Sequence, residues 1–290
     1  MDHWWRKQPS DHLGSVVEAE PLTGGFAHDV WRVRLRDGTR LVLKASEHVT
    51  PDVFTIEADG LRTLSRQGGA RTPEVVEAGP RHLLMEEMRP VPADDPRFWE
   101  EAGRMLARTH AAEPGTRFGW DGDGWLGLLR QHNPWSDDGY EFYAVHRILR
   151  YAAEPKAETA LNAADRAGLD RVCERLRDLI PPAGSVLAHG DLWHANVVAT
   201  SDGMPVFIDP AVHRTWAEAD LSMAACIPGI PEGFFKAYEE IRPLEDGWRD
   251  RMPIYHLREH LCVLAHFGAN AAEHTGHVEA IRRTLARFGG

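Results

Sequence analysis

The first third of the chain alternates apolar and polar side chains in the way that predicts paired β-strands. Between residues 29 and 46, tryptophan, valine and leucine alternate with arginine, which is the two-residue period of a strand. Asp37-Gly38 supplies a dipeptide favoured in tight hairpin turns. Apolar residues then recur at spacings of three and four over residues 52–67, which predicts a helix, and residues 82–88 read as a further strand.

Beyond the proline-rich stretch at 89–96, most apolar positions follow a helical period. Helices are expected over residues 98–112, 142–153, 169–179, 232–241, 253–267 and 278–288. Two apolar runs, Leu187–Val198 and Val206–Ala211, interrupt them as short strands. The pattern predicts an α+β protein with a small β-rich N-terminal lobe (residues 1–88), a hinge or linker (89–96) and a larger helical C-terminal lobe (97–290). Two such lobes leave a cleft between them.

Composition narrows the classes of function. The formal net charge of −11 argues against nucleic acid as a partner, because phosphate binding needs a basic face. No apolar run approaches the roughly 20 residues of a membrane span, and the N-terminus has no signal-peptide core, so we expect no membrane partner. Three widely spaced cysteines favour a reducing, cytoplasmic location. The oligomeric state is left open.

Two carboxylates and a carboxamide lie next to apolar runs that should be buried. Asp191 and Asn196 stand five positions apart, and Asp209 ends the next apolar run. His189, Asp191 and Asn196 match the spacing H-x-D-x-x-x-x-N of a kinase catalytic loop, in which the Asp accepts the substrate hydroxyl proton and the Asn binds Mg²⁺. Asp209 takes the place of the second metal-binding aspartate. A bound Mg²⁺ would be the cation that keeps these side chains ionised.

The N-terminal lobe supplies residues suited to bind ATP. Lys44, one of only four lysines, ends the second hairpin strand in L-V-L-K, the position of a phosphate-binding lysine, and Glu57 follows on the next helix, where it could pair with Lys44. Gly24 and Gly25 precede the first hairpin strand, where a glycine-rich loop would cover the phosphates. Residues from Glu86 to Met88 would form the hinge that offers backbone groups to adenine.

Two other motifs have simpler interpretations. His256, Glu259 and His260 formally match an inverted zinc-protease motif, but too little chain follows for a third ligand, so packed or solvated histidines on a helix are favoured. Residues 121–124 begin like a calcium loop but lack the later ligand and the glycine, which favours a turn.

The motifs together resemble the fructosamine kinase (ketosamine kinase) family, which is related to aminoglycoside and choline kinases and shares the protein-kinase-like fold. The resemblance rests on H-G-D-L-W-x-x-N with I-D-P-A, on E-A-D-L (Glu218 to Leu221), and on Gln131-x-Asn133-x-Trp135. It covers most of the chain. It implies ATP-dependent phosphorylation of a sugar hydroxyl, O3, on a free or protein-bound ketosamine, which is a deglycation repair reaction.

Departures from the family pattern lie near the expected acceptor site. The chain has W-H-A-N where W-S-G-N is usual, and T-W-A-E-A-D-L where G-H-R-E-A-D-L is usual. The resemblance makes Trp193, His194, Trp216 and Glu218 candidates for substrate contact. Two alternatives stay open: a kinase of another small hydroxyl compound, such as an aminoglycoside or amino sugar, and a nucleotide-binding regulator without turnover.

The length of one segment favours a small substrate. Only eight residues separate Asp209 from Glu218, and no A-P-E follows. This leaves no room for the long activation segment on which protein kinases dock peptides. Pro210 also stiffens the position where protein kinases switch between states.

Overall fold

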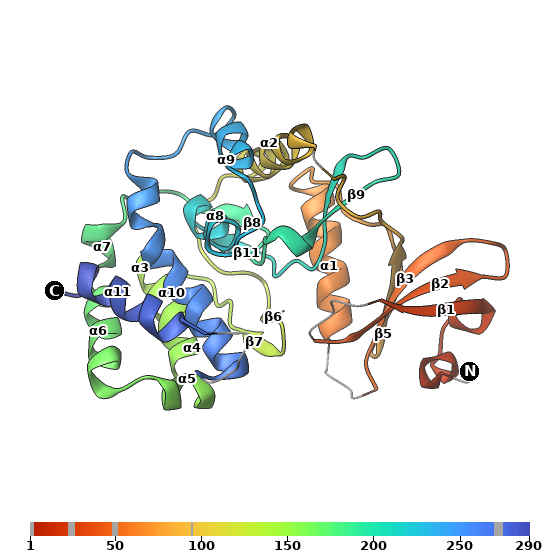
Figure 1. The fold of residues 1–290 in the computed structure, drawn as a ribbon, viewed down its shortest axis with the longest axis horizontal. Coiled ribbons are helices and arrows are strands. Elements are labelled where there is room, and N and C mark those ends of the chain that lie inside the picture. The colour runs from red at the N-terminus through yellow and green to blue at the C-terminus, as the bar shows by residue number, and fades with distance from the viewer. Residues whose placement is uncertain (1–2, 23–26, 48–51, 94, 270–274) are drawn as a thin grey trace.

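The structure is a computed structural model that describes residues 3–22, 27–47, 52–93, 95–269 and 275–290 (Figure 1). Its N-terminal part is an antiparallel five-stranded sheet with the strand order β1-β2-β3-β5-β4. Helix α1 (Val53–Arg66) packs its apolar face on β5. The strands are β1 (Val16–Leu22), β2 (Asp29–Leu35), β3 (Arg40–Ala45), β4 (Val75–Gly79) and β5 (His82–Glu86).

The hairpin expected over residues 29–46 is confirmed as β2 and β3, and the helix expected over 52–67 is confirmed as α1. Gly38 turns the hairpin with a φ of 93°, a conformation that glycine adopts without strain. The alternating pattern does not predict β1 or β4. These strands form the two edges of the sheet, and along β1 only Val16 is buried, so the alternation of apolar and polar residues is lost.

The C-terminal part is mostly helical and encloses a large apolar core. Its helices are α2 (Pro96–Ala112), α3 (Gly139–Tyr143), α4 (Arg150–Ala152), α5 (Pro155–Ala160), α6 (Ala163–Glu174), α7 (Leu176–Leu179), α8 (Ala217–Cys226), α9 (Glu232–Glu239), α10 (Trp248–Phe267) and α11 (His277–Phe288).

Several of these helices differ from the sequence-based expectation, and three of the differences have a clear physical reason. The run expected over 142–153 holds a π-helical stretch, Ala144–Leu149, that joins α3 to α4 and carries the buried Arg147. Helix α10 begins five residues before Pro253, because Trp248 and Met252 bury apolar side chains ahead of that proline. Helix α8 shows no apolar face because its residues 217–224 are all buried.

Short strands in the C-terminal part carry the loops of the expected active site. β8 (Val186–Ala188) pairs with β11 (His213–Thr215), and β9 (Val197–Ala199) pairs with β10 (Pro205–Phe207). A third pair, β6 (Gly124–Leu126) and β7 (Leu129–Gln131), lies near α1. The strands expected in the two apolar runs are therefore confirmed, with the first run divided into β8, a loop and β9.

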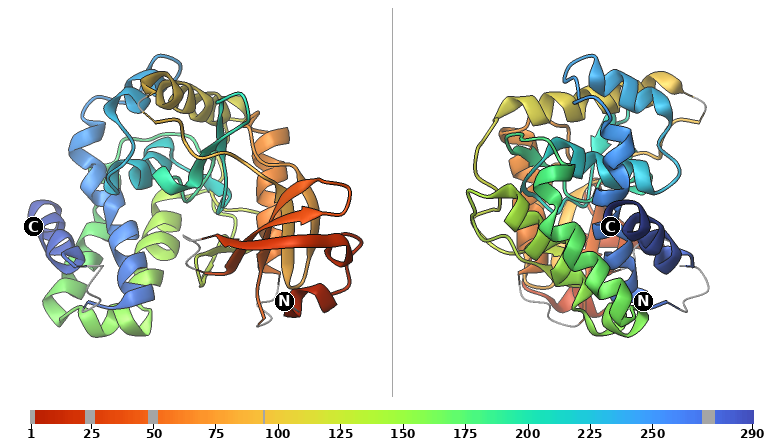
Figure 2. Two further views of the ribbon diagram at one scale, coloured as in Figure 1. Left: turned by 45° about the vertical axis from the view of Figure 1, so that its right-hand side comes forward. Right: turned by 90° about the vertical axis from the view of Figure 1, so that its left-hand side faces the viewer.

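The views agree on two lobes, with the sheet and α1 on one side and the helices on the other (Figures 1 and 2). The predicted α+β fold is confirmed. Between the end of β5 and the start of α2, Arg89 exchanges backbone hydrogen bonds of 2.7 and 2.8 Å with Ala199 of β9. Among the described residues, no helix has the length and apolar character needed to cross a bilayer.

Candidate active site

A loop between β8 and β9 carries the H-G-D-L-W-H-A-N motif. Gly190 has a φ of 83°, and a Cβ there would lie 2.1 Å from the backbone oxygen of Ala211. Only glycine fits so close an approach in the left-handed region. Gly190 therefore lets the chain turn tightly at Asp191 and keeps this loop against the segment that follows Asp209.

His189 links the two loops through both ring nitrogens. Its Nε2 lies 3.0 Å from the Ile208 oxygen, and its Nδ1 lies 3.3 Å from the Asp191 backbone nitrogen. These partners assign the proton to Nε2, because Nδ1 must accept from the Asp191 N–H. Burial lowers the pKa of His189, which keeps the ring neutral. His189 thus fixes the backbone at Asp191 relative to the residue before Asp209.

Asp220, on α8, holds the same loop in place through hydrogen bonds. Its carboxylate accepts from the His189 N–H at 2.8 Å, from the Gly190 N–H at 2.7 Å and from His110 Nε2 at 3.0 Å. Burial opposes ionisation, but these donors, the His110 side chain foremost, lower the pKa of Asp220 to about 2. E-A-D-L assigns no role to Asp220 by itself; the available signal was an aspartate in a stretch rich in alanine, leucine and methionine.

Asp191 and Asn196 lie in direct contact. Asn196 Nδ2 donates to the Asp191 backbone oxygen at 2.8 Å and to its Oδ2 at 3.2 Å. Burial raises the pKa of Asp191 to about 8, and Arg258 is the foremost charge that opposes this rise. A pKa near the working pH suits a side chain that accepts a proton during reaction.

Lys44 joins the lobes through two carboxylates. Its Nζ lies 2.7 Å from Glu57 Oε1 and also bonds to Asp209 Oδ1. The predicted contact between Lys44 and Glu57 is confirmed, while Asp209 is a partner that the sequence did not predict. Burial alone would lower the pKa of Lys44, but Asp209 and Glu57 hold it above its ordinary value. Asp209 has a φ of 56°, an uncommon backbone conformation for a residue other than glycine.

Helix α1 contacts the C-terminal lobe at two points along its length. A Cβ on Gly60 would lie 3.1 Å from Pro210 Cγ, so the helix packs closely on the residue after Asp209. At its N-terminus, Asp52 makes no capping bond and accepts instead from Arg130 at 2.7 Å and from Trp125 Nε1 at 2.9 Å. These contacts fix the helix that carries the partner of Lys44.

The residues expected around the nucleotide are only partly described. Gly24 and Gly25 lie outside the described residues. The Glu86 N–H donates to the Glu74 oxygen at 2.9 Å, so this hinge amide already has a partner. Met88 follows β5 and is half-buried.

The four substrate candidates separate into two pairs. Trp193 and His194 lie in the same loop as Asp191, two and three residues after it. Their ring centroids are 5.0 Å apart in an edge-to-face contact. Trp216 and Glu218 do not join them. β11 runs antiparallel to β8, so Trp216 follows the residue paired with Val186, at the far end of β8 from Asp191.

Burial and partners give Trp216 and Glu218 structural roles. Trp216 is 3% exposed and packs among aromatic rings that include Tyr143 and Tyr255. Glu218 is buried, and both of its carboxylate oxygens accept from Arg251. The structure does not bring these two residues to the Asp191 loop, and substrate contact by Trp216 and Glu218 stays a prediction.

The two-lobed fold and the set of Lys44, Glu57, Asp191, Asn196 and Asp209 define a small-molecule kinase with a protein-kinase-like fold. An aminoglycoside phosphotransferase with 15% identity aligns over 95% of this chain and 96% of its own, with a TM-score of 0.64, which supports the fold alone. Within this class, the chain belongs to the fructosamine kinase family, whose model matches residues 2–287.

Relatives agree with this assignment. A probable ketoamine kinase of Enterococcus faecium is 32% identical over 88% of this chain and 90% of its own, and one of Synechocystis sp. is 33% identical over 87% and 84%. The crystal structure of a candidate fructosamine-3-kinase from Thermobifida fusca, with 35% identity, covers 93% of this chain and 94% of its own with a TM-score of 0.82.

Proposed function

We propose that this protein catalyses ATP-dependent phosphorylation of a sugar hydroxyl, O3, on a ketosamine. The observation that carries the proposal is the convergence of Lys44 and Asp209 from opposite lobes beside the loop that bears Asp191 and Asn196, in a chain of the fructosamine kinase family. Its physiological role would be repair of glycated amines, since the phosphorylated adduct is expected to decompose.

In the proposed reaction the acceptor hydroxyl oxygen forms a bond to the γ-phosphorus of ATP, while the bond to the bridging β–γ oxygen breaks and ADP leaves. Asp191 accepts the hydroxyl proton. Lys44, held by Glu57, contacts the α- and β-phosphate oxygens. Its fixed charge contributes electrostatic stabilisation where negative charge shifts in the transition state. The backbone groups that follow Glu86, as far as Met88, would bind adenine.

The donor set fits Mg²⁺. Asp209 offers a carboxylate, and Asn196 uses its Nδ2 for both bonds to Asp191, which leaves its amide oxygen for a cation. These are the hard oxygen ligands that Mg²⁺ prefers. When bound, the ion would neutralise charge on the phosphates. The ion pair between Lys44 and Asp209 fixes the position of the Asp209 carboxylate.

Two features favour a small acceptor over a protein segment docked as in protein kinases. β11 and α8 begin within eight residues of Asp209, so ordered structure fills the place of a long activation segment. Trp193 and His194 lie in the catalytic loop and are the residues that we propose to contact the acceptor. An aminoglycoside or amino sugar as acceptor would leave the same mechanism in place.

The test is ADP release with Mg²⁺-ATP, comparing fructosyl-lysine, ribulosyl-lysine and an aminoglycoside panel, with Asp191→Asn as the inactive control. We expect turnover on a ketosamine that falls by about 10²- to 10⁴-fold in the variant. Turnover only on an aminoglycoside would overturn the substrate, and undiminished turnover by Asp191→Asn would overturn the mechanism. ATP binding without turnover on any acceptor would favour the regulator.

A further inference from the structure

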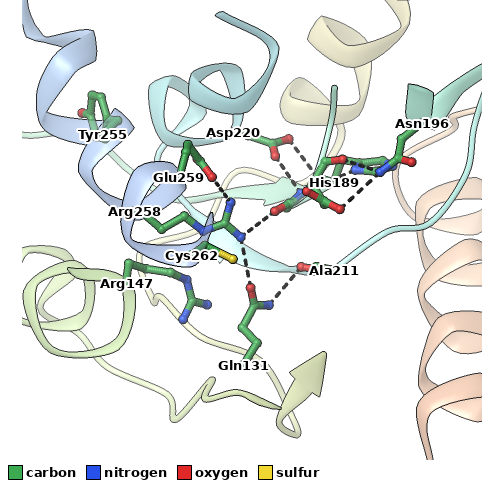
Figure 3. A network of polar contacts seen from close by, with 12 residues as sticks. Gln131, Arg147, His189, Asn196, Ala211, Asp220, Tyr255, Arg258, Glu259 and Cys262 are labelled. Carbon is green, nitrogen blue, oxygen red and sulfur yellow. Dashed lines mark hydrogen bonds and ion pairs between the residues drawn. The ribbon is translucent and has the colours of Figure 1, made fainter. Parts of the chain in front are cut away.

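We propose that Arg258 and Gln131 form a clamp that holds the Asp191 loop and the Asp209 segment at a fixed separation, with Arg258 as a positioning residue for phosphoryl transfer. The inference rests on the proposed function for its kinetic consequence. It deepens that function by assigning roles to two buried side chains that touch neither ATP nor acceptor in the mechanism above. Figure 3 shows Arg258 beside the loop that carries His189, with Gln131 between Arg258 and Ala211.

Arg258 reaches the catalytic loop from α10. Its Nη2 donates to the Gly190 backbone oxygen at 2.8 Å, one residue before Asp191, and to Gln131 Oε1 at 3.4 Å. Its Nη1 donates to Glu259 Oε2 at 2.7 Å. Arg258 is only 4% exposed, so these bonds are sheltered from water and from competition by solvent.

Gln131, at the end of β7, extends the clamp to the other loop. Its Nε2 donates to the Ala211 backbone oxygen at 3.1 Å, two residues after Asp209. The Ala211 N–H in turn donates to the His189 oxygen at 2.8 Å. A closed ring of contacts therefore runs through Arg258, the Gly190 loop, Ala211 and Gln131. Movement of either loop alone would break at least one member of this ring.

The choice of side chains fits a positioning role. A planar guanidinium can donate in several fixed directions at once, which a lysine ammonium does not match. Glu259, 2% exposed, offsets the charge of Arg258, so the clamp can place a charged donor on a buried carbonyl without an unpaired ion. Gln131 is fully buried, and its carboxamide supplies both the acceptor for Arg258 and the donor for the Ala211 oxygen.

A second buried arginine on α10 provides the matched control. Arg251 lies two turns earlier, is 8% exposed and pairs with Glu218 as Arg258 pairs with Glu259. Its described partners are Glu218 in the first turn of α8 and the backbone oxygens of Glu245 and Asp246, so Arg251 itself makes no bond to the Asp191 loop among the described contacts. Arg251→Lys therefore perturbs a comparable ion pair without loosening the clamp.

The experiment compares Arg258→Lys, Gln131→Met and Arg251→Lys, each checked for folding by circular dichroism. Misplacing catalytic groups by about 1 Å costs up to about 10²-fold in rate. We expect kcat on the ketosamine to fall at least about tenfold in the two clamp variants, with KM for ATP changed less than about threefold. Arg251→Lys should keep kcat within about twofold.

Hydrogen exchange gives a second readout that needs no acceptor. The Ala211 amide, which is bonded within the ring, and the Asp191 amide, which is bonded to His189 Nδ1 in the loop that the ring holds, should exchange at least about tenfold faster in the clamp variants than in Arg251→Lys. If the native protein turns over no ketosamine, the proposed function fails, and exchange alone decides the clamp. Gln131→Met leaves the Arg258–Glu259 pair intact, so it tests the clamp even if Arg258→Lys does not fold. Native exchange rates and native kcat in folded clamp variants would overturn the proposal.

Discussion

Replacement of Asp220 by asparagine tests how the catalytic loop is held. In the native protein one buried carboxylate accepts from two backbone N–H groups and from His110. Asparagine has the same shape but only one acceptor oxygen, and its NH2 group would face a donor. Gly190→Ala would disturb the same loop through a steric clash with the backbone, whereas Asp220→Asn removes only charge and acceptor capacity.

The expected loss of stability follows from the structure. The pKa of Asp220 is lowered from 3.8 to about 2, which corresponds to roughly 2–3 kcal/mol. A donor left without a partner costs about 1–3 kcal/mol. We therefore expect Asp220→Asn to lose about 3–5 kcal/mol of unfolding free energy, the range for a broken buried charge pair. At about 2 °C or more per kcal/mol, Tm should fall by about 6–10 °C.

The assay is differential scanning calorimetry, combined with kcat measured well below Tm. Because the folded pKa of Asp220 is depressed, its contribution is present above the unfolded value of about 4 and is lost as the pH falls through about 2. The Tm difference from the native protein should therefore stay constant between about pH 5 and 8.

Asp165→Asn is the matched control. Asp165 is also buried, but it pairs with Arg282 and accepts from the Asn162 N–H in the capping box of α6, away from the catalytic loop. That variant should lose about 1 kcal/mol and keep its kcat. If Asp220→Asn kept both the native Tm and the native kcat, the anchoring role of Asp220 would be refuted.

Three further predictions address other parts of the molecule. Gly190→Ala should abolish activity and lower Tm, since its Cβ would meet the Ala211 oxygen at 2.1 Å; a native Tm by calorimetry would contradict this. Lys44→Met should weaken ATP binding by titration calorimetry at least about tenfold, the cost of one charged hydrogen bond; native affinity would remove Lys44 from the phosphate site. Burial lowers the pKa of His256 and of His260 to about 4, so stability should fall as the pH drops from about 6.5 to 4, by about 1–3 kcal/mol for each ring. His256→Gln and His260→Gln should each flatten that decline in urea unfolding, and an unchanged slope would exclude the histidine.

The sequence predicted the parts of the molecule that have a local signature. The hairpin, α1 and the pairing of Lys44 with Glu57 follow from periodicity and from a rare lysine at a strand end. The catalytic roles given to Asp191, Asn196 and Asp209 stay predictions that the kinetic experiments test, although the structure brings their side chains close to one another or to Lys44.

Sequence periodicity and motif spacing assigned no structural role to the residues that support the site. Asp220, Arg258 and Gln131 come from three separate elements, and only the tertiary fold brings the first two to the Gly190 loop and Gln131 to Arg258 and Ala211. Conversely, Trp216 was a candidate for substrate contact because it lies in a stretch that departs from the family pattern near the expected acceptor site. β11 reverses the chain direction and carries Trp216 to the other end of β8. Contacts between distant segments have no period along the chain, so pattern analysis cannot detect them.

The attachment of α1 has a consequence for how nucleotide would enter and leave. Although α1 follows the first three strands in sequence, Gly60 packs on Pro210, and Asp52 bonds to Arg130. Mechanically the helix is bound to the C-terminal lobe as well as to its own sheet. A rotation that separates the lobes must therefore break these contacts or slide the sheet across α1. Sliding the sheet would carry Lys44 away from Glu57, so opening the cleft by that path would also disassemble the phosphate site.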